Sequence, residues 1–379
     1  MVDAIKRDIQ TQEERNNRRR LGQILLDYGF LSPAQLRLGL RRHQESGRFL
    51  GETLVETGLI GRKVWLETLS LQLGIPSIDL RAFNPEERII RTIPEELARS
   101  YTAIAVGHSG NELATAMRFP QNEEVVRKIE NTTSETVLPV IGWAGDIEKW
   151  LDEVYRTRPT KPSRAYEEPS TVEPSGLQQG LHLECNPLDI HASLYFNGLR
   201  GAIEAIPMEA VQEIIQILLK AYHEDKNIFI MGNGGSAATA SHFSCDLGKS
   251  TAVDGKKRFR VISLTENLSL LTAWANDSHY ENAFVEQLRN LIRVGDVVIG
   301  ISTSGNSPNV LNAIEYANSK RAITIGLTGF SGGKLKDMVR LCLIVPSFSV
   351  QHTEDVHHTL HHLISMHLRA ILRDKGEIY

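Results

Sequence analysis

"NIFIMGNGGSAATASHFSCDLGK" (residues 227–249) runs from an apolar segment through a glycine-rich turn into a predicted helix. His242 and Asp246 are four residues apart, so on a helix they share one face. A turn of this kind is typical of a nucleotide cradle, of a metal site on the following helix, or of a tight bend before a packed helix. The rest of the chain has to distinguish these interpretations.

A nicotinamide cofactor is disfavoured. Gly232, Gly234 and Ala237 fit the pattern G-x-G-x-x-A, but that fingerprint also requires an acidic residue about 20 positions later. The acidic residue near the next strand is Glu266, more than 30 residues after Gly232.

Strand–helix alternation predicts an α/β fold around this turn. Helical patterns separate most of the five short apolar segments, which are 227–231, 259–264, 296–301, 322–327 and 341–345. We expect a five-stranded parallel sheet with helices on both faces. Ligands in such sheets bind beyond the carboxyl ends of the strands.

A second turn, "ISTSGNSPN" (301–309), is rich in hydroxyl groups. Ser302, Thr303, Ser304 and Ser307 surround one predicted strand-to-helix turn. Hydroxyls and backbone N–H groups near a helix N-terminus suit a phosphate monoester. The two turns in one sheet therefore predict a phosphate-binding site.

Length and composition exclude several classes of protein. The 379 residues allow two or three domains, and a formal charge of −4 gives no reason to expect nucleic acid as a partner. There is no signal-peptide core and no stretch of about 18 apolar residues, so we expect a cytoplasmic protein without a membrane span. The three cysteines lack CxxC spacing, which disfavours disulfides and thiol-bound zinc.

Composition also predicts the domain organisation. We expect a disordered basic N-terminus (1–17), a small α+β domain (18–155), a proline-rich linker (156–185) and the larger α/β domain (186–379).

The small domain begins with a tandem helical repeat. Residues 20–43 and 49–72 align without a gap at a shift of 29 residues. Each copy reads as a short helix, a C-capping glycine (Gly29 or Gly58), a turn and a second helix.

This repeat resembles the N-terminal domain of type II secretion and type IV pilus assembly ATPases, which binds cyclic di-GMP in some members. The resemblance covers roughly residues 18–155, and no P-loop follows. Phe49 replaces the second motif arginine and His43 the first glutamine, so a docking domain without nucleotide remains an alternative. The resemblance implies these ligand-binding residues: Arg20, Leu21, Gly22, Leu25, Leu26, Gly29, Leu50, Gly51, Leu54, Gly58 and Gln72.

Residues of about 190–374 resemble the SIS (sugar isomerase) fold, most closely the phosphoheptose isomerases. The shared segments include "GNGGSAATASHF", "RVGDVVIGISTSGNSPNVLNAIEYA" and "EDVHHTLHHL". The resemblance implies aldose–ketose isomerisation of a phosphorylated sugar by a homo-oligomer, dimer or tetramer. It also implies substrate-binding residues: Asn233, Gly234, Ser236, Asp277, Ser302, Thr303, Ser304 and Ser307.

The same resemblance implies an acid–base pair and a zinc site. Asp246 stands where the family has a catalytic glutamate, and His362 where it has a catalytic histidine. The zinc ligands would be His242, Asp246, Glu354 and His362. The spacing of each pair along its helix agrees, since His242 and Asp246 share one face, as do Glu354 and His362.

Asp246 and Gln351 depart from the family pattern, which favours as an alternative a non-catalytic SIS module that binds a sugar phosphate or a protein. Six of the thirteen histidines lie between residues 352 and 367, and apart from His362 we interpret them as surface or interface residues.

Overall fold

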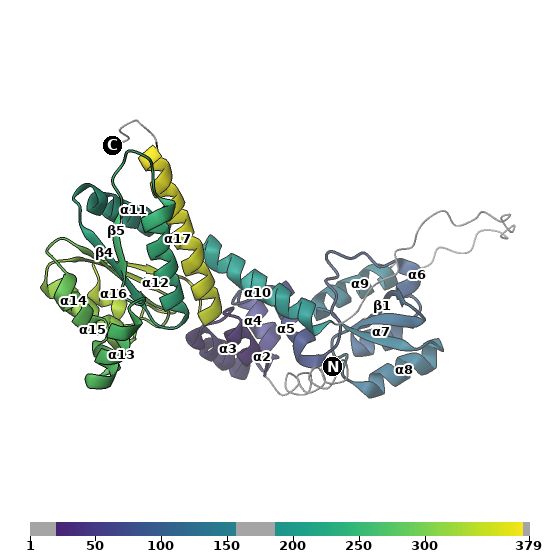
Figure 1. Ribbon diagram of the computed structural model, residues 1–379. Coiled ribbons are helices and arrows are strands. Elements are labelled where there is room, and N and C mark those ends of the chain that lie inside the picture. Colours follow the sequence, from purple (N-terminus) through teal and green to yellow (C-terminus); the bar gives the residue numbers. More distant parts are fainter. Residues whose placement is uncertain (1–19, 157–185, 374–379) are drawn as a thin grey trace, which may run out of the picture. The chain divides into compact units, whose positions relative to one another are not determined.

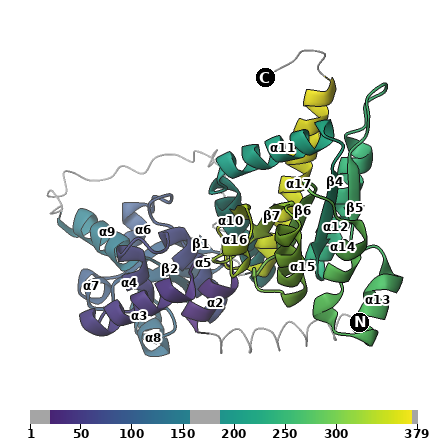
Figure 2. The same cartoon turned by 90° about the vertical axis from the view of Figure 1, so that its left-hand side faces the viewer.

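The computed structural model describes residues 20–156 and 186–373, which Figures 1 and 2 show in two views. Contacts divide the chain into two units. Unit 1 comprises Met1–Leu25 and Pro33–Leu194, and unit 2 comprises Leu26–Ser32 and Tyr195–Tyr379. The predicted N-terminal tail and nearly all of the predicted linker lie outside the described residues.

The tandem repeat forms four helices, as predicted. Gly29 and Gly58 both have a φ of +69°, the left-handed conformation that ends a helix. Beyond the repeat, the residues of unit 1 up to Arg156 form four further helices and a small sheet. The helices are α2 (Leu21–Asp27), α3 (Pro33–Ser46), α4 (Leu50–Glu56), α5 (Arg62–Leu73), α6 (Glu87–Ile90), α7 (Glu95–Tyr101), α8 (Glu123–Thr133) and α9 (Ala144–Arg156).

The sheet of unit 1 has three strands in the order β1–β2–β3, the first pair antiparallel and the second parallel. They are β1 (Ala103–Ser109), β2 (Glu112–Met117) and β3 (Val137–Ile141). Their apolar side chains form a separate core with α8 and α9. The predicted α+β character of this region is confirmed.

Unit 2 is built on a five-stranded parallel sheet in the order β5–β4–β6–β7–β8, as the sequence predicts. The strands are β4 (Asn227–Gly232), β5 (Arg260–Ser263), β6 (Val297–Ser302), β7 (Ile323–Thr328) and β8 (Leu341–Ile344). All five fall within one residue of the predicted apolar segments or inside them.

Two helices precede the first of these strands, the others follow it, and the first helix, α10, begins in unit 1. They are α10 (Pro187–Glu204), α11 (Met208–His223), α12 (Gly235–Cys245), α13 (Leu268–Asp277), α14 (Val285–Leu291), α15 (Pro308–Ser319), α16 (Leu335–Met338) and α17 (Val350–Arg373), with a π-helical turn η1 (Asp246–Ser250) and a 3-10 turn η2 (Tyr280–Asn282).

Alternating side chains of the central strands bury both faces of the sheet. Ile228 and Ile230 of β4 pack with α11, α12 and α17, whereas Phe229 and Met231 pack with α14, α15 and α16 on the opposite face. The sequence of α12 is rich in glycine, serine and threonine, which are weak helix formers. Its buried Phe243, worth roughly 1.5–3 kcal/mol, anchors α12 to the sheet by packing.

Within residues 20–156 and 186–373, no helix has the length and apolar character that crossing a bilayer requires.

Candidate functional site

The two polar turns of unit 2 lie at the same edge of the sheet. Strands β4 and β6 are parallel neighbours, and Gly232 is paired with Ile301 at their carboxyl ends. The side-chain amides of Asn233 and Asn309 exchange two hydrogen bonds, each 2.8 Å long, across this edge. The sequence prediction that both turns contribute to one site is therefore compatible with the sheet register.

A pocket of about 400 Å³ opens beside this amide pair. Its lining residues are Asn233, His279, Tyr280, Glu281, Pro308 and Asn309. The Tyr280 hydroxyl donates to Asn233 Oδ1 at 2.9 Å, which ties the 3-10 turn η2 to the glycine turn. The pocket is thus lined by polar side chains from three segments.

The glycine turn leads directly into the N-terminus of α12. Gly234 has a φ of +55°, a conformation that side-chain-bearing residues rarely adopt. Ser236 follows in the first turn of α12 and is buried. Asn233, Gly234 and Ser236 therefore lie at the start of the helix, and their contact with substrate remains a prediction.

The serine-rich turn after β6 is held by its own hydroxyl groups. Ser302 and Ser307 lie 2.9 Å apart through their Oγ atoms, and Ser304 Oγ accepts the Asn306 N–H at 3.2 Å. Ser307 occupies the N-cap position of α15 without capping it through its side chain. The hydroxyls and the helix N-terminus therefore face the same turn, which suits an anion.

Asp277 is less closely connected to this edge. It ends α13, and its Oδ1 accepts a hydrogen bond from the adjacent Asn276 at 2.9 Å. Asp277 is not among the residues that line the pocket. Its predicted contact with a sugar hydroxyl remains a prediction.

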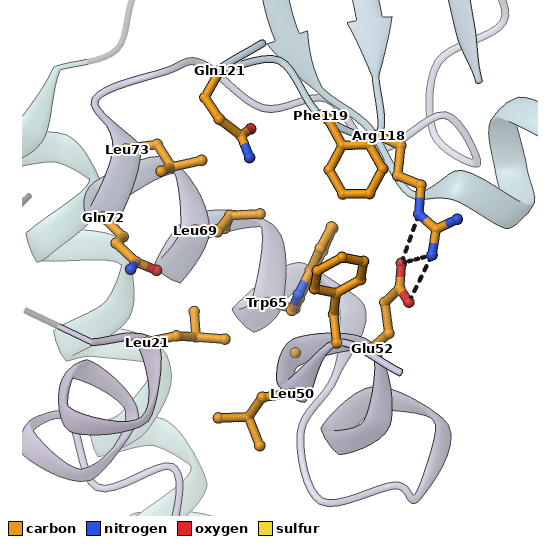
Figure 3. Close-up of a pocket in the computed structure, with 12 residues that line it drawn as sticks. Leu21, Leu50, Glu52, Trp65, Leu69, Gln72, Leu73, Arg118, Phe119 and Gln121 are labelled. Carbon is orange, nitrogen blue, oxygen red and sulfur yellow. Dashed lines mark hydrogen bonds and ion pairs between the residues drawn. The ribbon is translucent and has the colours of Figure 1, made fainter. Parts of the chain in front are cut away.

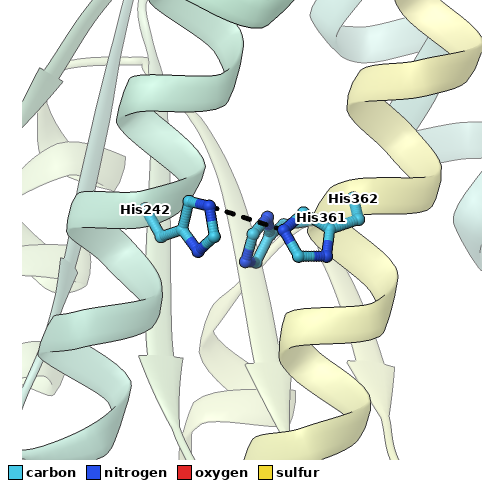
Figure 4. A group of neighbouring side chains, drawn as sticks. All are labelled: His242, His361 and His362. Carbon is cyan, nitrogen blue, oxygen red and sulfur yellow. Dashed lines mark hydrogen bonds between the residues drawn. The ribbon is translucent and has the colours of Figure 1, made fainter.

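Helices α12 and α17 lie side by side and run in the same direction. Thr239 contacts His358, and farther along Asp246 contacts His361. Figure 4 shows the two helices with the imidazoles between them. This parallel alignment brings the predicted acid and base together within one chain.

His242, His361 and His362 form a group whose ring nitrogens lie within 4.8 Å of one another. The Nε2 atoms of His242 and His362 are 3.4 Å apart. The side chains of these two residues are 46% and 50% exposed, whereas His361 is fully buried. The group is therefore open to solvent at His242 and His362 and closed to it at His361.

Asp246 lies at the centre of this group. Its Oδ2 is 3.7 Å from His362 Nε2 and 3.2 Å from His361 Nδ1, and its Oδ1 is 3.9 Å from His242 Nε2. Asp246 begins the π-helical turn η1, where the Thr251 N–H reaches back to the Asp246 carbonyl. Such turns are frequent at functional sites. The predicted pair Asp246 and His362 is thus in contact, although helix α12 ends one residue earlier.

Glu354 lies at the other end of the helix pair. Its carboxylate packs so closely against Gly235 that a Cβ there would be 2.4 Å from it. This position at the N-terminus of α12 is electrostatically favourable for a carboxylate. Of the four predicted metal ligands, the structure brings His242, Asp246 and His362 together, and Glu354 is about 12 Å along the α17 axis from His362.

The interpretation of the remaining histidines as surface or interface residues is wrong for three of them, which are buried inside unit 2. His352, His357 and His361 are at most 1% exposed. Burial lowers the pKa of His357 and of His361 to about 4, so both rings are neutral near pH 7. His357 and His361 are four residues apart, and the apolar Leu360 and Ile364 are close to them in sequence. This helical spacing was the available signal that this face of α17 is internal.

Unit 1 contains a second pocket, of about 280 Å³ (Figure 3). Four predicted ligand-binding residues line it: Leu21, Leu50, Gly51 and Gln72. Leu25 and Leu54 are instead fully buried in the helical packing, and Gly22, Leu26, Gly29 and Gly58 are not among the lining residues. Arg20 precedes Leu21 and is exposed.

The sequence did not predict a role for Arg118 and Phe119, which follow directly after β2 and also line this pocket. Arg118 forms a paired hydrogen bond with Glu52, from Nε to Oε1 at 3.1 Å and from an Nη to Oε2 at 3.0 Å. Its guanidinium lies 5.7 Å from the ring centre of Phe49, the residue that replaces the motif arginine. No local pattern connects residues 49 and 118, so only the fold reveals this neighbour.

Comparison with known proteins follows the same division. A family model described as SIS domain matches residues 195–329, and one described as MshEN domain matches residues 73–161. The phosphoheptose isomerase of Geobacter metallireducens is 38% identical over 168 residues, which are 44% of this chain and 88% of that protein. The phosphoheptose isomerase of Helicobacter pylori is 40% identical over 166 residues, 44% of this chain and 85% of that protein.

Solved structures include similar chains for each part. Phosphoheptose isomerase GmhA from Neisseria gonorrhoeae is 32% identical, covers 48% of this chain and 99% of its own, and gives a TM-score of 0.45. A structure of MshE with cdg is 31% identical, covers 36% of this chain and all of its own, and gives a TM-score of 0.32.

Proposed function

Since this chain belongs to the phosphoheptose isomerase family, we propose that it is a SIS-type aldose–ketose isomerase of a phosphorylated sugar. The observation that carries the proposal is the 3.7 Å approach of His362 Nε2 to Asp246 Oδ2. A carboxylate and an imidazole at this distance, open to solvent on one side, suit two coupled proton transfers.

The two turns would bind the substrate. The phosphate would lie among Ser302, Thr303, Ser304 and Ser307, where hydroxyl donors and the N-terminus of α15 meet. Asn233, Gly234 and Ser236 would line the sugar chain. Asp277 would accept a hydrogen bond from a sugar hydroxyl.

The residues of the helix pair would carry out the chemistry. Asp246 removes a proton from the carbon next to the carbonyl, and His362 donates a proton to the carbonyl oxygen, which gives an enediol. Return of a proton to the other carbon, with loss of the proton from the second oxygen, completes the exchange of aldose and ketose. No external oxidant is consumed, because the electron pair moves within the substrate.

A zinc ion fits the donor set. Two nitrogens bound to one tetrahedral zinc at about 2.0–2.1 Å are roughly 3.3 Å apart, and His242 and His362 Nε2 are 3.4 Å apart. His242, His362 and Asp246 would hold the ion, and Glu354 would join only after its carboxylate left Gly235. Bound zinc would polarise the sugar's oxygen atoms.

The test is turnover of sedoheptulose 7-phosphate and related ketose phosphates by the purified full chain with added zinc. We expect the paired aldose phosphate to appear, and Asp246→Asn to lower kcat by about 10²–10⁴-fold, the usual contribution of a general base. Asp254→Asn, an exposed change on the loop after η1, serves as the control. Absence of turnover on every ketose phosphate contradicts the proposal.

A non-catalytic SIS module that binds a sugar phosphate or a protein is the second candidate. It is favoured by the burial of Asp246, whose two oxygens accept hydrogen bonds from Ser250 and His361. Thermal-shift measurements with phosphosugars, made beside the turnover assay, separate the two. Stabilisation of the fold without turnover selects the binding module.

Regulation by cyclic di-GMP would act through unit 1. The MshEN match and the pocket lined by Leu21, Leu50, Gly51 and Gln72 support this proposal. Arg20 would supply the charge for a phosphate, and Phe49 a ring on which a guanine stacks.

A homo-oligomer, dimer or tetramer, also forms part of the proposal. Helix α13 has no buried residue, although Leu268 and Leu270 are among its side chains and are 69% and 36% exposed. Covering this apolar helix with a second copy would remove it from water. Light scattering should therefore give a mass of two or four times the 42.4 kDa of one chain.

A further inference from the structure

We propose that His361 is a positioning residue that holds the carboxylate of Asp246 in place for proton transfer, and that His358 in turn fixes the ring of His361. The inference rests on the isomerase function proposed above and adds two residues to its site. Neither residue belongs to the acid–base pair or to the predicted metal ligands.

Both oxygens of Asp246 are anchored. Ser250 donates its hydroxyl to Oδ1 at 3.0 Å, and His361 Nδ1 lies 3.2 Å from Oδ2. Ser250 comes from the π-helical turn η1, whereas His361 comes from α17. The carboxylate is therefore held from two elements and cannot rotate without losing a partner.

The Asp246 carboxylate ends this series of hydrogen bonds and sets the direction of each of them. An ionised carboxylate only accepts, so His361 must carry its proton on Nδ1. The neutral ring then accepts on Nε2, from His358 Nδ1 at 3.1 Å. The Thr239 hydroxyl donates to the Gly235 carbonyl at 3.2 Å, and its oxygen also lies 3.2 Å from His358 Nε2. Protonation of both rings on Nδ1 therefore satisfies the contacts from His358 through His361 to Asp246.

The surroundings of His361 suit positioning rather than contact with substrate. Its side chain is fully buried, and its ring stacks on Phe243 with centroids 5.6 Å apart and an interplanar angle of 26°. The buried ring bonds to Asp246 and packs against the rings of His242 and His362, so it acts on the reaction through these groups rather than on substrate.

The short side chain of Asp246 explains why hydrogen bonds to both carboxylate oxygens would matter for catalysis. Asp246 reaches its position with one methylene fewer than a glutamate, so small rotations of its carboxylate change the distance to a substrate proton. A misplacement of about 1 Å can cost on the order of 100-fold in rate. Hydrogen bonds to both oxygens limit these rotations while His362 remains on the open side.

The first test compares three substitutions of His361 in the full chain. His361→Asn keeps an N–H close to the place of Nδ1, whereas His361→Gln keeps one near Nε2 and His361→Leu keeps neither. We expect His361→Leu and His361→Gln to lower kcat by about 10–100-fold, the usual effect of losing such an outer partner, with little change in KM. His361→Asn should restore most of kcat.

His357→Asn is the matched control, because His357 is a buried histidine of α17 whose ring bonds to the Thr328 carbonyl and not to Asp246. Circular dichroism checks that each variant folds. Equal kcat values for His361→Leu and wild type, or equal losses in His361→Leu and His361→Asn, would overturn the proposal.

A second test does not depend on turnover. Long-range ¹H–¹⁵N correlation spectra of the wild type should show His361 protonated on Nδ1, and Asp246→Ala should abolish this preference. A wild-type ring protonated on Nε2 overturns the inference even if the enzyme is active. Absence of turnover in a wild type with the Nδ1 tautomer instead contradicts the isomerase function.

Discussion

The Nε2 atoms of His242 and His362 lie 3.4 Å apart, although 120 residues of sequence separate them. Helices α12 and α17 bring them together by packing in parallel on one face of the sheet. Two imidazoles at ligand-to-ligand distance, with Asp246 beside both, predict the behaviour of the site towards metals.

We expect His242→Ala and His362→Ala each to weaken binding of zinc or cobalt(II) by more than about 100-fold, since even partners outside the ligand set cost about 10–100-fold. Calorimetry with zinc and the visible spectrum of the cobalt form measure the effect. The exposed His367 on the same helix provides the control, His367→Ala. Undiminished affinity in both variants would contradict the proposed ligand set.

The serine turn predicts an effect on substrate binding. Ser302→Ala and Ser307→Ala remove hydroxyls that face each other at 2.9 Å. A hydrogen bond to a charged group contributes about 1.5–3 kcal/mol, so KM should rise about 10- to 100-fold with a smaller change in kcat. Ser319→Ala, at the far end of α15, should leave KM unchanged. A fall in kcat alone would place the phosphate elsewhere.

Unit 1 predicts a requirement for two arginines. If cyclic di-GMP binds, calorimetry should show affinity lowered by about 10-fold or more in Arg20→Ala and in Arg118→Ala, because each loses a charged donor near the pocket. Arg127, which is paired with Glu123 on the surface of α8 and lies outside the pocket, provides the control variant Arg127→Ala. No heat with the wild type rejects the sensor proposal.

His357 predicts that stability falls in acid. Burial lowers its folded pKa to about 4, while an unfolded histidine titrates near 6.5. The unfolded state therefore binds the proton first, so stability decreases as pH falls from about 6.5 towards 4, by up to about 3 kcal/mol in total. Among the described residues, Nδ1 of His357 has no hydrogen-bond partner, so a proton added there is left unsatisfied.

Denaturant unfolding at pH 7 and pH 5 checks this expectation. His357→Gln should lose less stability between the two pH values than the wild type does, whatever its stability at pH 7. An identical pH dependence in both proteins would show that His357 titrates normally.

Local sequence patterns were sufficient to predict the strands and helix ends and the serine-rich turn of the site. Apolar runs of five or six residues predicted the strands of the sheet, and the hydroxyl-rich turn after β6 was visible in residues 302–307. Positive φ values at Gly29 and Gly58 agree with their predicted role as helix ends. These features depend on residues within a few positions of one another, so the sequence contains the whole interaction.

The sequence by itself therefore determined the two kinds of fold, the tandem repeat, the two turns and the spacing of His242 and Asp246 on one helix. Only the tertiary structure decided that His361 and Ser250 hold Asp246, that Glu354 packs against Gly235, and that Arg118 lies over Phe49. The physical reason is the range of the interactions. Helix periodicity is set locally, whereas the relative alignment of α12 and α17 depends on how their buried side chains pack on the same sheet.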